Sequence, residues 1–159
     1  TDIHDWQKAK APALKTDQDY LKEAKAILGR VDDQDAGRAD GTEIKQLRAS
    51  HLLHILLREF PKSPLAAEAM YLIGTSYEVM GDLGYWNLGE TYFRACISRE
   101  PHSEIAERCF RRYENSVTLG YTGSSGTMIP GLVKGQLTDL KALATRKKEV
   151  APTSSKKKK

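Results

Sequence analysis

Hydrophobic residues recur along most of the chain at spacings of three and four, the pattern of α-helices that bury one face. No segment shows the strict alternation of apolar and polar residues that would predict a strand. The sequence therefore predicts an all-α protein. The predicted helices cover about residues 16–28, 42–60, 63–80, 88–99, 103–117 and 131–143.

Residues typical of helix ends support these boundaries. Thr16, followed by acidic residues, predicts an N-cap for the first helix. Pro61 and Pro101 each predict the end of a helix, since proline cannot continue one. Ser63, with Pro64 at the first helical position, and Ser103 then predict the starts of the next helices.

The segments around the two prolines repeat each other. Residues 60–69 match residues 100–109 at an offset of 40, with the same proline, the same serine two positions later, and small or apolar residues at the same helical phase. Such a repeat indicates helical hairpins that cannot bury their apolar faces alone and stack on their neighbours.

The unit between these segments resembles a tetratricopeptide repeat. Small residues at Gly74 and Gly89 would let two helices approach closely, with Tyr77 and Phe93 filling the space between them. Two features depart from the family pattern: Met70 stands where the family has Trp, and residues 83–87 lengthen the turn. The residues that match the pattern are Met70, Ile73, Gly74, Tyr77, Gly89, Phe93 and Pro101.

The resemblance implies a right-handed stack of about three antiparallel helical hairpins, a tetratricopeptide-like α-solenoid, over residues 16–145. Residues 1–15 are then an N-terminal arm, and residues 146–159 a disordered basic tail. Residues 120–127, rich in glycine and hydroxyl side chains, are interpreted as a flexible loop. Similarity to small bacterial envelope proteins built from such repeats implies a location in the periplasm or cell envelope, with the cytoplasm as the alternative.

The net charge of +4 changes this picture little, because it lies at the end of the chain. Residues 1–143 sum to −2 and residues 144–159 to +6, so the folded part is not basic. The lysines at 156–159 suggest an alternative function, binding to nucleic acid or to an anionic membrane surface. No apolar run is long enough to predict a transmembrane segment.

Residues that could carry enzyme chemistry are not arranged for it. His51 and His54 share a helix face without a suitable ligand set, so they are interpreted as ordinary helix histidines. Cys96 and Cys109 are expected to be buried thiols, with a single disulfide between them as the alternative. We therefore expect no enzymatic activity, no metal and no cofactor.

Basic residues within the folded part gather on one helix, at Arg108, Arg111 and Arg112. In the family, the first helix of each hairpin lines a concave groove that holds a partner segment. The resemblance thus implies a non-enzymatic adaptor or scaffold that binds a protein or peptide, with an acidic segment or a C-terminal carboxylate as the expected guest. The predicted partner-binding residues are Glu68, Tyr71, Thr75, Glu78, Arg108, Arg111, Arg112 and Asn115.

Two alternatives remain at this site. The arginines could instead pair with Glu104, Glu107 and Glu114 on a solvated face. A second copy of the chain could also be the partner and form a homo-oligomer, by covering the broadly apolar helix over residues 44–60 or the last helix.

Overall fold

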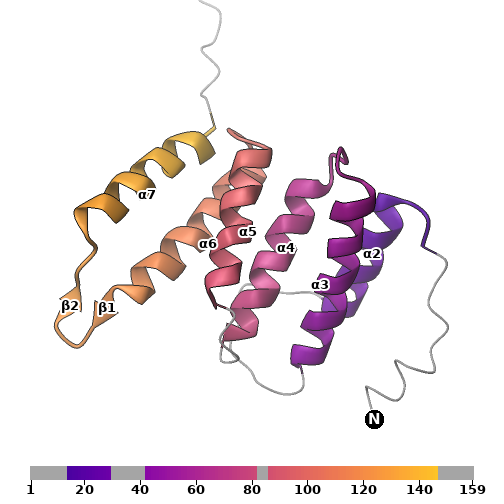
Figure 1. The fold of residues 1–159 in the computed structure, drawn as a ribbon, viewed down its shortest axis with the longest axis horizontal. Helices are drawn as coiled ribbons and strands as arrows, with labels where there is room; N and C mark the ends of the chain where they lie inside the picture. Colours follow the sequence, from indigo (N-terminus) through magenta and orange to yellow (C-terminus); the bar gives the residue numbers. More distant parts are fainter. Residues whose placement is uncertain (1–13, 30–41, 82–85, 147–159) are drawn as a thin grey trace, which may run out of the picture.

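The structure, a computed structural model, describes residues 14–29, 42–81 and 86–146 (Figure 1). These residues form six helices and one pair of very short strands, which confirms the all-α class. Residues 1–13 of the predicted arm, the acidic segment 30–41 and the tail from residue 147 lie outside the described ranges. The elements are α2 (Asp17–Leu28), α3 (Thr42–Glu59), α4 (Ala66–Val79), α5 (Trp86–Arg99), α6 (Glu104–Gly120), β1 (Thr122–Gly123), β2 (Gly126–Thr127) and α7 (Gly131–Ala144).

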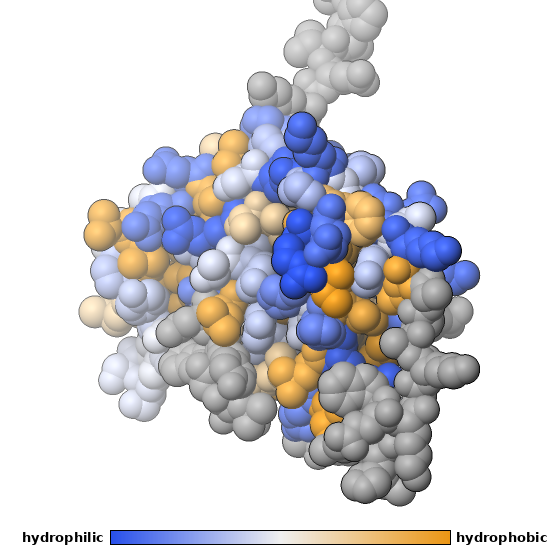
Figure 2. Space-filling model, turned by 45° about the vertical axis from the view of Figure 1, so that its right-hand side comes forward, coloured by the Kyte–Doolittle hydropathy of each residue, from blue (hydrophilic) through white to orange (hydrophobic). Residues whose placement is uncertain are grey.

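The helices lie side by side in the order of the chain, each packed mainly on the helices before and after it (Figure 1). α4 also contacts α6, although α5 lies between them in sequence. Figure 2 shows that hydrophobic and hydrophilic groups are interspersed over one face of the molecule. The apolar surface of the described helices is thus buried mainly between consecutive helices.

Two hydrophobic clusters form the core, and α4 contributes to both. One cluster, with Leu53 and Ile73, joins α2, α3 and α4. The other, with Phe93 and Phe110, joins α4 through α7. Since a helix buried on two sides needs apolar residues around most of its circumference, this position explains the high apolar content of α4.

The glycines at the α4–α5 contact act as the sequence predicts. A Cβ atom added to Gly74 would lie 2.5 Å from Cε1 of Phe93, a ring that is completely buried. A Cβ atom on Gly89 would lie 3.1 Å from the carbonyl oxygen of Gly74. The two helices can therefore approach this closely only because both positions lack a side chain.

The helices that begin within the two segments matching at an offset of 40 start differently. Ser103 is the N-cap of α6, because its hydroxyl accepts a hydrogen bond from the amide of Ala106 at 3.1 Å. The prediction that α4 begins at Ser63 and Pro64 is wrong, since α4 begins at Ala66. The Ser63 hydroxyl accepts a hydrogen bond from the amide of Leu65 at 3.0 Å within the turn before α4. It also donates to the Asp17 carboxylate at 2.6 Å and so ties this turn to α2.

Cys96 and Cys109 form a disulfide that links α5 to α6. The prediction of two free thiols was therefore wrong and its alternative correct, while the predicted burial is confirmed. The cause is the turn between the helices, which brings cysteines 13 positions apart to a Cα–Cα distance of 6.4 Å. A distance of this size is normal for a disulfide.

The region after α6 also differs from prediction. The predicted flexible loop contains β1 and β2, which pair antiparallel through Thr122 and Thr127. On α7, Val133, Leu137 and Leu140 pack against the core, but Leu132 is 78% exposed. Leu143 is exposed as well, so the predicted inward face of this helix is narrower than the sequence indicated.

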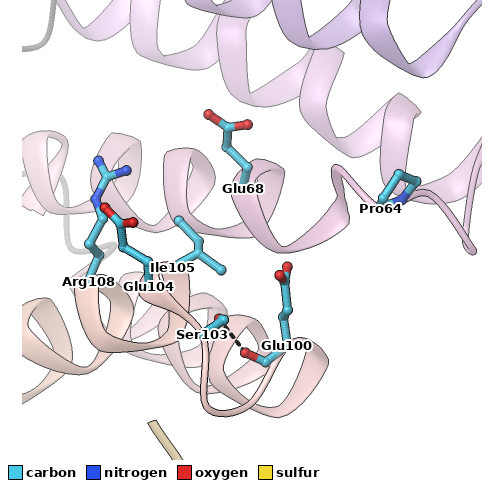
Figure 3. Close-up of a pocket in the computed structure, with 7 residues that line it drawn as sticks. All are labelled: Pro64, Glu68, Glu100, Ser103, Glu104, Ile105 and Arg108. Atoms are coloured by element: carbon cyan, nitrogen blue, oxygen red, sulfur yellow. Dashed lines mark hydrogen bonds between the residues drawn. The ribbon is translucent and has the colours of Figure 1, made fainter. Parts of the chain in front are cut away.

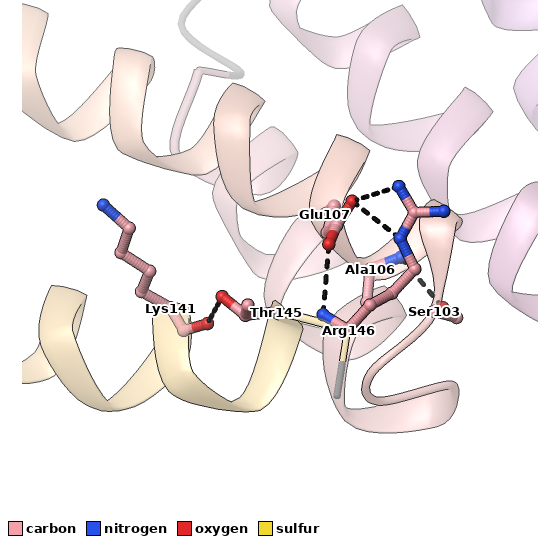
Figure 4. Close-up of polar contacts among 6 residues, drawn as sticks. All are labelled: Ser103, Ala106, Glu107, Lys141, Thr145 and Arg146. Atoms are coloured by element: carbon pink, nitrogen blue, oxygen red, sulfur yellow. Dashed lines mark hydrogen bonds and ion pairs between the residues drawn. The ribbon is translucent and has the colours of Figure 1, made fainter. Parts of the chain in front are cut away.

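The end of α7 is held to the start of α6 by polar contacts. The His102 amide and ring Nδ1–H donate to the carbonyl oxygens of Leu143 and Thr145, both at 2.9 Å. Arg146 donates to the Glu107 carboxylate from its amide and its guanidinium, at 3.0 and 3.1 Å (Figure 4). Arg146, predicted to begin the tail, thus belongs to the folded part.

Candidate functional site

Five of the eight predicted site residues line a single hollow of about 280 Å³ between α4 and α6. Tyr71 comes from α4, and the other four come from α6 at spacings of three and four that place them on one side of the helix. The lining residues are Tyr71, Arg108, Arg111, Arg112 and Asn115.

Arg108 is oriented by an aromatic ring. Its guanidinium carbon lies 4.4 Å from the centroid of Tyr71, a cation–π contact. Tyr71 is buried and packs against Phe93, so the ring is a fixed platform. Neither Arg108 nor Arg111 makes a hydrogen bond or ion pair with another residue of the described ranges, which leaves their N–H groups available for a guest.

Arg112 differs from these two because it pairs with Glu78 on α4 at 3.3 Å. The two side chains are only 20% and 22% exposed, so this ion pair is largely shielded from solvent. Burial raises the pKa of Glu78 to about 7, with Arg112 opposing the change and Glu90 adding to it. Glu90 in turn accepts a hydrogen bond from Ser116 at 2.8 Å.

The alternative in which the arginines interact with glutamates of their own helix holds in part, because the charge of Arg111 acts on Glu107. Arg112 pairs with Glu78 across the helix interface, and Glu107 pairs with Arg146. The hydrogen bonds from Arg146 lower the pKa of Glu107, and the charges of Arg146 and Arg111 lower it further.

Three predicted residues lie outside the hollow. Glu78 pairs with Arg112 but does not line the hollow. Thr75 is buried and donates to the carbonyl of Leu72 in its own helix, so its hydroxyl is turned away from a guest. Glu68 lines a neighbouring hollow and pairs with Lys25 of α2 at 2.6 Å.

The neighbouring hollow has a volume of about 310 Å³ and shares Arg108 with the first (Figure 3). Glu100 and Glu104 line this hollow but were not predicted as site residues from the sequence. For Glu104, the match at an offset of 40 offers a signal. At the offset of 40, Glu104 occupies the position of Pro64, and Arg108 the position of Glu68. The lining residues are Pro64, Glu68, Glu100, Ser103, Glu104, Ile105 and Arg108.

The histidines and cysteines singled out from the sequence have structural surroundings. His54 donates from Nδ1 to the Ser50 carbonyl and accepts from the Tyr92 hydroxyl through Nε2, while His51 is exposed. Both cysteine sulfurs are in the disulfide. Across the part of the chain that the structure describes, no three His, Cys, Asp or Glu residues gather as a metal site would require.

Comparison with protein-family models, with curated proteins and with solved structures found no match to the chain. Of the helices within the described ranges, none is both long and apolar enough to cross a bilayer. The lysines at 156–159, which suggest binding to polyanions, lie outside these ranges. The hollow between α4 and α6 is therefore the feature on which a function can be argued.

The raised pKa of Glu78 predicts a pH-dependent stability. Between pH 4.5 and 7 the folded protein retains a proton that an unfolded Glu has released, so the free energy of unfolding falls as the pH rises through this range. A shift of this size corresponds to at most about 3–4 kcal/mol, and we expect about half of this because the side chain is partly exposed. Urea titrations from pH 4 to 8 measure the effect.

Glu78→Gln isolates this contribution. In this variant, we expect the free energy of unfolding to lose the part of its pH dependence between pH 4.5 and 7 that Glu78 causes. Glu59→Gln, at an exposed position on α3, should keep that pH dependence. A Glu78→Gln profile parallel to that of the wild type would show that this carboxyl does not retain its proton.

Proposed function

We propose that the protein is a non-enzymatic adaptor whose helices α4 and α6 form a groove for an acidic segment or C-terminal carboxylate of a partner protein. The observation that carries this proposal is the hollow in which Arg108 and Arg111 form no hydrogen bond or ion pair with other described residues, while Tyr71 orients Arg108. An arginine guanidinium binds a carboxylate through two parallel hydrogen bonds, which gives such a guest affinity and a defined orientation.

The sequence repeat supports a tetratricopeptide-like arrangement of the helices. In a tetratricopeptide-like solenoid, the three hairpins would be α2 with α3, α4 with α5, and α6 with α7, and the first helices would line the groove. The contact between α4 and α6 across the sequence fits this assignment. At the offset of 40, Tyr71 corresponds to Arg111, so equivalent positions of two repeats face one hollow.

The disulfide supports a location in an oxidising compartment. Structural disulfides persist in extracytoplasmic compartments and are rare in the cytosol of mesophiles. Together with the resemblance to small bacterial envelope proteins, this leads us to propose the bacterial periplasm or cell envelope as the location. In that setting the bond also fixes α6, which carries the arginines, against α5.

Reversing two charges tests the proposal. Peptides selected from a random display library on the wild type should be acidic, and Arg108→Glu with Arg111→Glu should weaken their binding by at least tenfold. Charge-assisted hydrogen bonds contribute about 1.5–3 kcal/mol each, and 1.4 kcal/mol corresponds to a factor of ten. Isothermal titration calorimetry with synthetic peptides measures the loss.

Arg58→Glu is the matched control, because Arg58 is an exposed arginine of α3 that does not line the hollow. It should leave peptide affinity within about twofold of the wild type. Circular dichroism shows whether each variant is folded. Selected peptides without acidic residues, or equal affinity for the folded double variant, would refute the proposed site.

A further inference from the structure

The two hollows between α4 and α6 carry opposite charges. One is lined by Arg108, Arg111 and Arg112, and the other by Glu68, Glu100 and Glu104. Arg108 lines both, so the hollows adjoin along α6 as one surface. The groove is therefore acidic near the start of α6 and basic farther along the helix.

The acidic end has solvent-exposed carboxylates, and the charge of one of them, Glu104, adds to the effect of Glu107 in raising the pKa of Arg146. Glu100 and Glu104 are exposed and form no ion pair within the described ranges, whereas Glu68 already pairs with Lys25. In Figure 3, Glu100 comes from the turn before α6 and Glu104 from the first turn of α6, whereas the Glu68 carboxylate on α4 points away from the start of α6. Ile105 adds an apolar contact to the lining. Basic groups of a guest would complement this end.

The centre of the groove is fixed more firmly than its ends. Arg108 is held over Tyr71, whose ring is buried against Phe93.

The distance between the two ends of the groove determines the length of the guest. From Glu104 to Arg111 the rise of an α-helix corresponds to about 10 Å. An extended peptide covers this distance with about three residues.

We propose that the groove binds an extended partner segment whose charge changes sign along its length, with basic residues against Glu100 and Glu104 and acidic residues against Arg108 and Arg111. This preference rests on the function proposed for the site and defines the chemistry of its partner. A uniformly acidic segment would engage only the basic half and would meet repulsion at the other.

Three synthetic peptides of seven residues test the preference by calorimetry. The first has two lysines at one end, three uncharged residues, and two glutamates at the other end. The second has the same composition with alternating charges, and in the third alanines replace the lysines. The first peptide is made in two versions, one with its lysines at the N-terminal end and one with them at the C-terminal end. We expect the version that binds more tightly to bind at least tenfold more tightly than the second and third peptides.

Glu100→Lys with Glu104→Lys should abolish this advantage, because the variant repels lysines but retains the basic hollow. The alanine-substituted peptide should bind the variant at least as tightly as the wild type. Glu100→Gln with Glu104→Gln, which adds no charge, should reduce the advantage in the same direction. Glu59→Lys, on the exposed end of α3, is the control and should leave the advantage unchanged.

The outcomes distinguish this preference from the proposed function. If the alanine-substituted peptide binds the wild type as tightly as the charge-segregated one, the change of sign is irrelevant and only an acidic guest is selected. If the glutamate variants keep the full advantage, the acidic hollow does not contact the guest. If none of the three peptides binds while library-selected acidic peptides do, the preference is wrong and the adaptor function stands. If neither kind binds, both fail.

Discussion

Replacing Cys96 and Cys109 together by alanine lowers the free energy of unfolding of the oxidised protein by about 3 kcal/mol. The disulfide closes a loop between residues 13 positions apart and thereby restricts the unfolded chain. Both residues are fully buried in the cluster that supports α6, so the loss also affects the helix that carries the arginines. Urea unfolding followed by circular dichroism measures the change.

Reductant provides the control for this prediction. Reduced wild-type protein should unfold at a lower urea concentration than oxidised protein, because reduction breaks the bond but keeps both sulfur atoms. The double alanine variant should be insensitive to reductant. An unchanged midpoint of the wild type on complete reduction would show that the bond contributes nothing to stability.

Gly74→Ala should destabilise the protein by about 2 kcal/mol, although alanine is the better helix former. The added Cβ atom would lie within 3 Å of three ring atoms of Phe93, which is fully buried and has no space to move into. Gly135→Ala is the matched control, since Gly135 lies within α7 with open space at its Cβ position. That substitution should raise the free energy of unfolding by up to about 1 kcal/mol.

A double-mutant cycle checks the cause. Phe93→Leu removes part of the ring, so it should cost the wild type about 1–2 kcal/mol but partly relieve the strain in the Gly74→Ala protein. We expect the double variant to lose at least about 1 kcal/mol less free energy of unfolding than the sum of the losses in the two single variants. Additive effects would show that the two positions do not contact each other as the structure has them.

The helices could be predicted because their signals are local. Apolar spacing identified all six helices of the described ranges, and the cap at Ser103 depends only on residues within one turn. Ser63 misled the prediction because its hydroxyl accepts from the amide of Leu65 within a turn, and the helix begins only at Ala66. The disulfide depends on how α5 and α6 turn toward each other, which spacing alone does not define.

The candidate site was predictable to the extent that it follows helix periodicity. Arg108, Arg111 and Asn115 lie on one helix face, and the repeat placed Tyr71 opposite them. Periodicity does not show which hydroxyl is occupied within its own helix, as at Thr75. It also gave no weight to Glu100, which lies in the turn before α6 and outside the helical pattern.

The attachment of α7 makes one end of this helix the expected starting point of local unfolding. Its polar contacts, through His102 and Glu107, are at the end near Ala144, whereas Leu132 at the opposite end is exposed. Local unfolding starts where few contacts are lost, so we expect the end of α7 beside the β1–β2 hairpin to separate from the core before the end near Ala144. The contacts that it would lose, such as that of Val133 with the core, are few, and the groove between α4 and α6 is not among them.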